Sequence, residues 1–387
     1  MESETAEAGR GTDYDMVVVG AGPAGATFAR LAARRYRVLL VDRRTEGVKC
    51  CGGLVAPDAQ AQLARFDIGI PKRVVADPQL FYVRSVDLET GRERRYQRHY
   101  TNVDRGAFDA YLLELLPRGV DFRSGARYLG HREADRGLVV EIEGKGGVEE
   151  ISCGVLVGAD GAFSRVRSKA LGDFASIRKY LAVQGEFVRL DPVRHYAVFF
   201  DRTLTDFYSW LIPKDDALIL GGAFRGEEDA RGKFERLVEA VGRKGYRLGA
   251  RTKIDACFVL RPRLRDIRIG EGKVALIGEA AGFISPSSAE GLSYAYASAV
   301  ALARALERPD AAWLARYRRG TARLRLNILG KNLKGIVMYN RFLRNLVFMS
   351  GIGSLGGGGT RRSAEGYPAK DSGGARNEDD DAGSRAG

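Results

Sequence analysis

The stretch that decides the fold runs from Asp13 to Asp42 and reads DYDMVVVGAGPAGATFARLAARRYRVLLVD. An apolar run over 13–19 predicts a strand, and the alanine-rich stretch from about residue 23 to 35 predicts a helix. A second apolar run over 37–41 predicts another strand. Two strands joined by a helix form a β-α-β unit, which predicts a parallel sheet.

The turn between the first strand and the helix carries the pattern Gly20-x-Gly22-x-x-Gly25. Gly20 allows a tight turn, Gly22 allows the backbone to approach a pyrophosphate, and Gly25 allows the helix to pack closely on the strand. Asp42 ends the second strand, where a carboxylate accepts hydrogen bonds from an adenosine ribose. The segment predicts a dinucleotide site, with contacts from Gly20, Ala21, Gly22, Pro23, Ala24, Gly25, Asp42 and Arg43.

Two later segments favour FAD over NAD, because they resemble the second and third fingerprints of the flavoprotein hydroxylases and reductases. They read VGADGAFSRVR over 157–167 and LIGEAAGFISP over 276–286. The resemblance implies that an acid, here Glu279 in place of the usual Asp, binds the ribityl chain. It also implies that the next helix points its N-terminus at the isoalloxazine, where it stabilises the anionic reduced ring. The cofactor residues implied here are Arg105, Asp160, Gly161, Glu279, Gly282, Pro286, Gly291 and Leu292.

The order of motifs over roughly 13–345 resembles the geranylgeranyl-reductase-like flavoproteins, and within them most closely the bacterial CbrA branch. The likeness is carried by four segments: CGGLVAPDAQ over 51–60, YQR over 96–98, IRKY over 177–180 and GEAAGFIS over 278–285. The family also has an aromatic signature, which here reads YSWLIP over 208–213 and GGA over 221–223. Ile212 stands where the family has Phe, and Ala223 replaces a Gly.

The resemblance implies reduction of carbon–carbon double bonds in an isoprenoid lipid. Reduced FAD would deliver a hydride to one carbon and a proton would reach the other, so placement and proton supply must contribute strongly. The implied catalytic residues are Cys51, in a Cys-Gly-Gly turn, and the aromatic pair Tyr208 and Trp210. Because the sequence holds no second dinucleotide motif, NAD(P)H would act transiently or a protein donor would act instead.

Two other functions stay open from the sequence. Flavin-dependent monooxygenases and halogenases share the three fingerprints, although hydroxylases usually have His where this chain has Gly282. The second alternative is a flavin- or lipid-binding protein without turnover. With three separated histidines and four scattered cysteines, we expect neither a metal site nor a disulfide framework.

The sequence predicts an α/β protein with a Rossmann-like FAD domain and an α+β second domain. Short runs of alternating apolar and polar residues over 78–100 and 180–224 predict antiparallel strands that cover the flavin. We expect the FAD domain over 13–76, 101–175 and 255–310, the antiparallel-sheet substrate domain over 77–100 and 176–254, a basic helical segment over 311–350 and a disordered tail over 351–387. Further helices are expected over 108–116 and 291–306, and a strand over 274–277.

The composition, 45% hydrophobic and 29% charged, is that of an ordinary globular protein, and the net charge is +13. Without a signal peptide or a long apolar run we expect a cytoplasmic protein. Nucleic acid is the least favoured anionic partner, because no nucleic-acid motif accompanies the charge. The segment 311–350 has nine basic residues, no acidic residue and many apolar ones. Such a segment either caps the core or lies on an anionic membrane at the inner face. The oligomeric state stays open.

Overall fold

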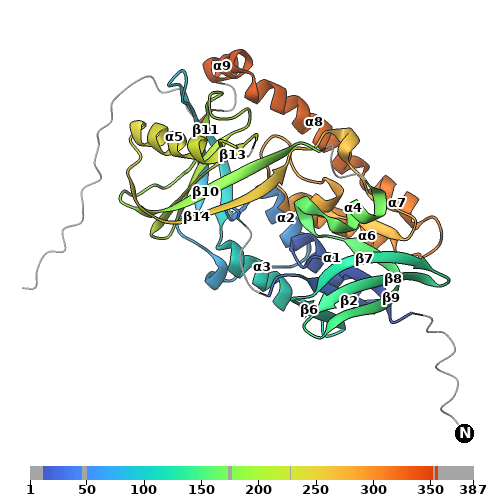
Figure 1. Ribbon diagram of the computed structural model, residues 1–387. Coiled ribbons are helices and arrows are strands. Elements are labelled where there is room, and N and C mark those ends of the chain that lie inside the picture. The colour runs from blue at the N-terminus through green and yellow to red at the C-terminus, as the bar shows by residue number, and fades with distance from the viewer. Residues whose placement is uncertain (1–11, 46–49, 173–176, 227, 352–353, 356–387) are drawn as a thin grey trace, which may run out of the picture. The chain divides into compact units, whose positions relative to one another are not determined.

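The computed structural model of the chain describes residues 12–45, 50–172, 177–226, 228–351 and 354–355 (Figure 1). The mixed α/β fold predicted from the sequence is confirmed, and it is built on two sheets. The N-terminal β-α-β unit consists of β1 (Tyr14–Val19), α1 (Pro23–Ala32) and β2 (Val38–Asp42). The two strands pair in parallel, as predicted, and Pro23 stands in the first turn of α1, where its missing N–H has no partner to lose.

The first sheet has the strand order β15-β16-β9-β1-β2-β6. Its remaining strands are β6 (Val120–Ser124), β9 (Gly147–Gly158), β15 (Gly270–Glu271) and β16 (Val274–Leu276). β9 is long because it belongs to two arrangements: it pairs in parallel with β1 and β16, and antiparallel with β8. β7 (Arg127–Ala134) and β8 (Gly137–Gly144) complete this antiparallel extension.

Helices α1, α6 (Leu292–Ala305) and α7 (Trp313–Gly320) pack on the first sheet. Their contribution to the core includes Phe28, Leu302 and Tyr317, which are completely buried. The central strands β1 and β2 are apolar over residues 16–19 and 38–41, because these stretches are buried on both faces. The other helices along this part of the chain are α2 (Pro57–Arg65), α3 (Arg105–Glu114) and α4 (Arg165–Leu171), with 3-10 turns η1 (Lys72–Val74), η2 (Gly161–Phe163), η3 (Leu264–Asp266) and η4 (Gly278–Ala281).

The second sheet has the order β14-β10-β13-β12-β11-β4-β5-β3. Its strands are β3 (Leu54–Val55), β4 (Leu80–Asp87), β5 (Glu93–Asn102), β10 (Lys179–Arg189), β11 (Tyr196–Phe200), β12 (Ser209–Lys214), β13 (Ala217–Phe224) and β14 (Leu248–Leu260). The prediction of an antiparallel sheet was wrong for one pair, since β11 and β4 are parallel. The reason is topological: the chain leaves β5, adds β6 to β9 to the first sheet, returns to the second sheet as β10, and then places β11 along β4 in the same direction.

The two faces of the second sheet have different covers, as Figure 1 shows. Alternate residues of β11, Ala197 and Phe199, face the helix α5 (Ala230–Arg243), with which they share a core cluster. Tyr196, Val198 and Phe200 belong to another cluster, which includes residues of the C-terminal helices. This alternation is the two-residue period of a strand that is buried on both sides.

The C-terminal segment is helical, as predicted, and consists of α7, α8 (Ala322–Tyr339) and α9 (Arg341–Ser350). Arg344 of α9 is 3% exposed, and its Nε lies 2.7 Å from Oδ2 of the equally buried Asp87 on β4. This ion pair fixes α9 to the second sheet. Among the helices that the structure describes, none has the length and hydropathy to cross a membrane.

The division of the chain into two domains stays a prediction, because the described residues up to 355 form one compact unit. Two strands also cross the expected boundaries: β5 continues past residue 100 and β14 past residue 254. The predicted tail over 351–387 lies almost wholly outside the described residues.

Replacing Arg344 with Met is expected to lower the free energy of unfolding by about 3 kcal/mol. The reason is that the carboxylate of Asp87 then stays buried without its partner. Arg341→Met is the matched control, because Arg341 is 61% exposed and its ion pair with Glu89 contributes little. Denaturant unfolding of both variants measures the difference. Equal losses would show that the buried pair does not hold α9.

Candidate functional site

The three glycine-containing segments meet at one edge of the first sheet. β1, β9 and β16 are parallel neighbours, so the loops that follow Val19, Gly158 and Leu276 leave the sheet side by side. A Cβ placed on Gly20 would lie 2.6 Å from the carbonyl oxygen of Ala159. One placed on Gly278 would lie 2.9 Å from the Cβ of Ala24. The first predicted fingerprint therefore contacts both of the others.

The three glycines of the first fingerprint meet different constraints. Gly20 has a φ of +103°, which only glycine adopts readily, and Gly25 leaves no room for a side chain because its Cβ would lie 1.9 Å from the Gly20 carbonyl oxygen. Gly22 has ordinary dihedral angles, and a Cβ there would have no heavy atom within 4 Å. Nothing in the described protein requires glycine at this position, and this open space fits a cofactor that approaches the backbone.

Helix α1 begins directly behind this open space. Its N-cap residue Gly22 supplies no side-chain hydrogen bond to the first turn. The backbone N–H groups of that turn and the positive end of the helix dipole are therefore available to a phosphate. The geometry fits the pyrophosphate of the predicted FAD.

The buried carboxylate of Asp42 is held by hydrogen bonds at the end of β2. It accepts bonds from the backbone N–H groups of Ala21 and Arg44 and from the Arg44 guanidinium, at 2.8–3.2 Å. Burial raises the pKa of Asp42, but these hydrogen bonds lower it more, so the group is charged at neutral pH. Arg43, predicted as a contact residue, has an exposed side chain, and a role for it at the cofactor stays a prediction.

Asp160 joins the second fingerprint to helix α4. Its Oδ2 accepts hydrogen bonds from the backbone N–H groups of Arg165 and Val166 at 2.7 and 3.2 Å. Its Oδ1 is buried and has no hydrogen-bond partner among the described residues. Burial raises the pKa of this carboxyl. An orphaned oxygen at this edge of the sheet fits a hydroxyl donor on a bound cofactor. Gly161, next in the chain, has a φ of +78°.

The third fingerprint forms a short turn and leads into α6. Arg167 connects it to the second, because its guanidinium donates to the carbonyl oxygens of Asp266 and Ala280 at 2.8 and 3.4 Å. Glu279 accepts a bond from the Leu260 N–H at 3.4 Å. The remaining predicted residues are Gly282 at a φ of +86°, Pro286, whose carbonyl accepts a bond from Arg261, and Gly291 and Leu292, which begin α6 without a side-chain cap.

Cys51 and Arg105, which are far apart in the sequence, lie in contact. The Arg105 Nη1 is 3.1 Å from the Cys51 Sγ, and its Nε donates to Asp109 at 2.8 Å. Arg105 begins α3 because Asp104 caps the helix by accepting a bond from the Ala107 N–H, so the helix starts before the predicted residue 108. The Arg105 side chain is 9% exposed. The pKa of Arg105 is lowered by burial but raised more by Asp109 and Cys51.

The Cys51-Gly52-Gly53 turn packs on the strand that carries the aromatic signature. A Cβ on Gly52 would lie 2.4 Å from the Cδ1 of Ile212, and one on Gly53 would lie 2.6 Å from the Lys214 Nζ. Lys214 donates to the Gly53 carbonyl at 3.1 Å, to the Asn102 Oδ1 at 2.6 Å and to the Val103 carbonyl. All three N–H bonds are used, so Lys214 is a positioning residue for the turn.

Tyr208 and Trp210 lie with their rings 5.7 Å apart, beside the loop that precedes α6. The Tyr208 hydroxyl donates to the Ser288 carbonyl at 2.6 Å, and the Trp210 indole N–H donates to Gln184 at 3.3 Å. A Cβ on Gly221 would lie 2.5 Å from the Trp210 ring, which explains the glycine in the signature. The structure therefore places the aromatic pair, the cysteine turn and Arg105 around one region.

Sequence reasoning missed three residues at the site: Arg44, Lys214 and Glu290. Glu290 accepts hydrogen bonds from Tyr100 at 2.6 Å and from Arg98 at 3.3 Å. Lys214 directly follows the aromatic signature, and Glu290 directly precedes the start of α6. The positions of Lys214 and Glu290 next to recognised motifs were the available signal, but their partners come from distant parts of the chain. The partner of Arg44 is Asp42, two residues before it.

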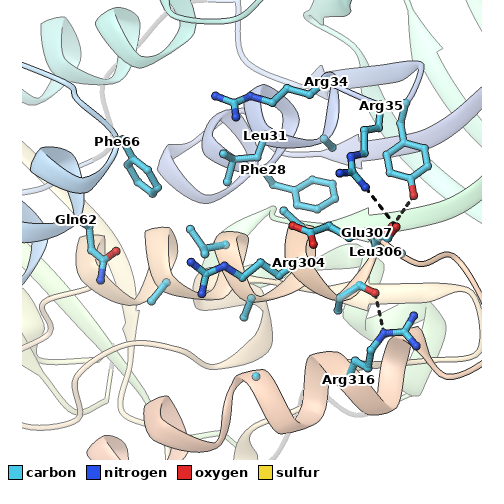
Figure 2. Close-up of a pocket in the computed structure, with 18 of the residues that line it drawn as sticks. Phe28, Leu31, Arg34, Arg35, Gln62, Phe66, Arg304, Leu306, Glu307 and Arg316 are labelled. Atoms are coloured by element: carbon cyan, nitrogen blue, oxygen red, sulfur yellow. Dashed lines mark hydrogen bonds between the residues drawn. The ribbon is translucent and has the colours of Figure 1, made fainter.

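A groove of about 760 Å³ lies elsewhere, between α1, α6 and α7 (Figure 2). None of the predicted site residues lines it. Cavity size alone therefore does not mark the predicted flavin site in this protein.

The open space at Gly22 predicts that Gly22→Ala folds like the natural protein but binds FAD at least about tenfold more weakly, because the added methyl group meets only the cofactor. Gly25→Ala is the contrasting variant and is expected to misfold or to lose much of its stability. Thermal unfolding and FAD titration measure the two effects. Normal FAD affinity in Gly22→Ala would contradict this placement of the pyrophosphate.

Lys214 predicts a pH-dependent stability. Burial lowers the pKa of Lys214 to about 8, from an ordinary value of 10.5. Between these values the unfolded chain binds more protons, so the natural protein gains stability as the pH rises. Relative to Lys214→Met, which has no titrating group there, this gain is about 2 kcal/mol between about pH 8 and pH 10. Denaturant unfolding of both proteins measures it, and a difference independent of pH would contradict the assignment.

Comparison with known proteins agrees with this geometry. Residues 13–185 match the family described as FAD binding domain. Protein CbrA of Escherichia coli O6:H1 is 39% identical over 349 residues, which cover 88% of this chain and 94% of that protein. Protein CbrA of Shigella sonnei is also 39% identical, and the match covers 98% of that protein.

Solved structures share the fold at lower identity. A geranylgeranyl bacteriochlorophyll reductase-like protein from Thermoplasma acidophilum has a TM-score of 0.75 at 20% identity, over 86% of this chain and 90% of that one. PqsL of Pseudomonas aeruginosa, a probable FAD-dependent monooxygenase, has a TM-score of 0.67 at 19% identity, over 87% and 98%. By its identity to the CbrA proteins along nearly their whole length, and by its FAD binding domain, the chain belongs to the CbrA family of FAD-dependent oxidoreductases.

Proposed function

We propose that the protein reduces a carbon–carbon double bond of an isoprenoid or similarly apolar lipid. The observation that carries the proposal is the position of Cys51, whose Sγ lies 3.1 Å from Arg105 on a turn that packs against the aromatic strand β12. This arrangement joins a group that can hold a proton, a fixed positive charge and an apolar surface. The reductase-like protein of Thermoplasma acidophilum, with the same fold, supports the choice.

The described residues that would hold FAD are the first turn of α1, Asp42 with Arg44, Asp160, and the loop that begins α6. Bound FAD would supply the two electrons of the reduction. NAD(P)H, or a protein donor, would load them. These residues would bind and orient the flavin, and they take no direct part in the chemistry of the substrate.

Cys51 is proposed to hold the proton that reaches the second carbon of the double bond. Arg105 donates its hydrogen bond to the Sγ and leaves the thiol proton free to point elsewhere. After transfer, the guanidinium at 3.1 Å balances the negative charge on sulfur. Lys214, through Gly53, keeps the turn in place.

The aromatic residues are proposed to orient the lipid and to exclude water. Tyr208 is 8% exposed, and its cluster includes Tyr100, Tyr196, Phe200 and Phe207. Burial raises the pKa of the Tyr208 hydroxyl well above its ordinary value, so this group stays neutral. The aromatic rings of this cluster favour contact with a hydrocarbon chain.

The test is a single half-reaction without oxygen. The FAD-loaded protein is reduced with dithionite, a geranylgeranyl lipid is added, and the return of oxidised flavin absorbance is followed together with the saturated product. Cys51→Ser should slow this step by about 10²-fold or more, because a general acid is lost. Cys153→Ala, which removes a buried thiol of β9, is the control that keeps the natural rate.

Two results would overturn the proposal. A reduced flavin that ignores the lipid but reacts quickly with oxygen and hydroxylates a substrate would make the protein a monooxygenase. A bound flavin that no lipid and no oxygen-dependent substrate reoxidises would make it a binding protein without turnover.

A further inference from the structure

The outward face of α8 and α9 exposes a row of large apolar side chains, which we call the outer stripe. It consists of Leu326, Leu329, Leu333, Ile336, Val337, Phe342, Leu346, Val347 and Met349. Phe342 is 69% exposed, Leu326 68% and Ile336 61%. Along α8 the members recur every three or four residues, which places them on one side of the helix.

The outer stripe faces outward because the opposite sides of both helices are fixed. On α8, Ile328 is fully buried and the Tyr339 hydroxyl donates to the Ser287 carbonyl at 2.7 Å. On α9, Arg344 forms its buried ion pair with Asp87. Turning either helix to hide the outer stripe would expose this core and break these bonds. The apolar face is therefore left for a partner, because monomeric proteins rarely expose such contiguous patches.

The charge around the outer stripe indicates an anionic partner. Between residues 311 and 350 the sequence has nine basic residues and no acidic one. Three of the nine pair with carboxylates from outside the segment (Arg344 with Asp87, Arg341 with Glu89 and Arg316 with Asp310), so the other six give the segment its net positive charge. Arg323 and Lys334 are exposed on α8 itself. A second copy of this chain would bring the same positive charges together, which costs energy. Anionic lipid head groups, in contrast, attract basic residues that flank an apolar helix face.

The groove in Figure 2 adds positive charge where α8 begins. It is lined by Arg323 and Leu324 of α8's first turn, and its other arginines are Arg34, Arg35, Arg65, Arg304 and Arg316. Glu307 is the acidic residue in this lining, and Phe28 and Leu31 contribute apolar surface. Arg35 donates to the carbonyl oxygen of Glu307, and Arg316 donates to that of Ala305 and pairs with Asp310 at 2.8 Å. The charge for a phosphate is therefore expected from Arg34, Arg65, Arg304 and Arg323. A phosphate with an attached acyl chain fits this combination of an arginine rim and apolar surface.

We propose that the outer stripe inserts into the surface of an anionic phospholipid bilayer, with the arginine-lined groove on α1, α6 and α7 binding lipid phosphates. Helices of this kind lie in the plane of the interface and do not cross the membrane. The binding is a property of α8, α9 and the groove, and it does not depend on the reaction that the flavin site catalyses.

The same two helices also contact the proposed substrate region. Met338 and Tyr339 of α8 and Phe348 of α9 belong to the aromatic cluster that contains Tyr208. If the proposed function holds, a lipid substrate would pass from the bilayer to the aromatic surface along these helices. This second step rests on the proposed function, whereas the membrane binding does not.

Vesicle flotation with the full-length, FAD-loaded protein tests the membrane proposal. The protein should float with vesicles of phosphatidylcholine plus phosphatidylglycerol, much less with phosphatidylcholine alone, and less at high salt. The double variant Ile336→Glu with Phe342→Glu should bind at least about tenfold more weakly. Val148→Glu is the matched control, since Val148 is 61% exposed on β9, away from these helices, and should bind normally. The flavin spectrum checks that each variant is folded.

Three results would overturn the proposal. The first is natural protein that stays with the soluble fraction. The second is a double variant that floats as well as the natural protein. The third is a lipid-free dimer that the double variant converts to a monomer, since the outer stripe would then bind a second copy. The double variant Arg34→Glu with Arg304→Glu tests the groove. If this variant keeps the preference for anionic vesicles, the groove does not bind lipid phosphates. Loss of reductase activity alone affects none of these measurements.

Discussion

The arrangement of the whole site depends on the parallel pairing of β9 with both β1 and β16. This pairing brings the ends of three strands, separated by more than a hundred residues of sequence, to one edge of the sheet. The loops beyond them carry the three flavin fingerprints, and they fit together only because Gly20, Gly25 and Gly278 have no side chains. A binding site at the carboxyl edge of a parallel sheet is thus a consequence of the strand order.

The parts of this architecture that follow local rules could be predicted from the sequence. The β-α-β unit follows from apolar periodicity and from the spacing of Gly20, Gly22 and Gly25, and the helical C-terminal segment follows from its composition. Most of what the sequence left undecided depends on contacts between distant segments. The parallel β11–β4 pair comes from a crossover, which strand periodicity does not encode. One undecided point is local: Asp42 is held by Arg44, two residues further along the chain, and two adjacent arginines do not show which of them the turn brings to the carboxylate.

In the proposed reacting region, too, some residues could be selected from the sequence, and others could be found only from their contacts in the structure. Cys51, Arg105, Tyr208 and Trp210 were selected by resemblance, and the structure brings them to one place by packing a glycine turn on Ile212. Lys214 was missed because its importance lies in three acceptors that come from other parts of the chain. Lys214 is buried and all its N–H groups donate hydrogen bonds, so its role is to hold the turn in position. Its pKa is lowered because burial disfavours its charged form.

Helices α8 and α9 connect the interior to the surface. Their inner sides complete the aromatic cluster, and their outer sides carry the outer stripe. Under the two proposals, one pair of helices would therefore form both a wall of the substrate region and the contact with the bilayer. This arrangement would suit an enzyme that acts on a lipid, because the apolar substrate would pass from the bilayer to the substrate region without entering water.

We propose that FAD binds with its reacting ring beside Cys51, Arg105 and Trp210. A crystal structure of the FAD-bound protein tests it most directly. We expect the pyrophosphate at Gly22, and the isoalloxazine between the start of α6 and the cysteine turn, in contact with Arg105 or the Cys51 sulfur. An isoalloxazine bound away from the cysteine turn and the aromatic strand, or a pyrophosphate outside the first turn of α1, would contradict it.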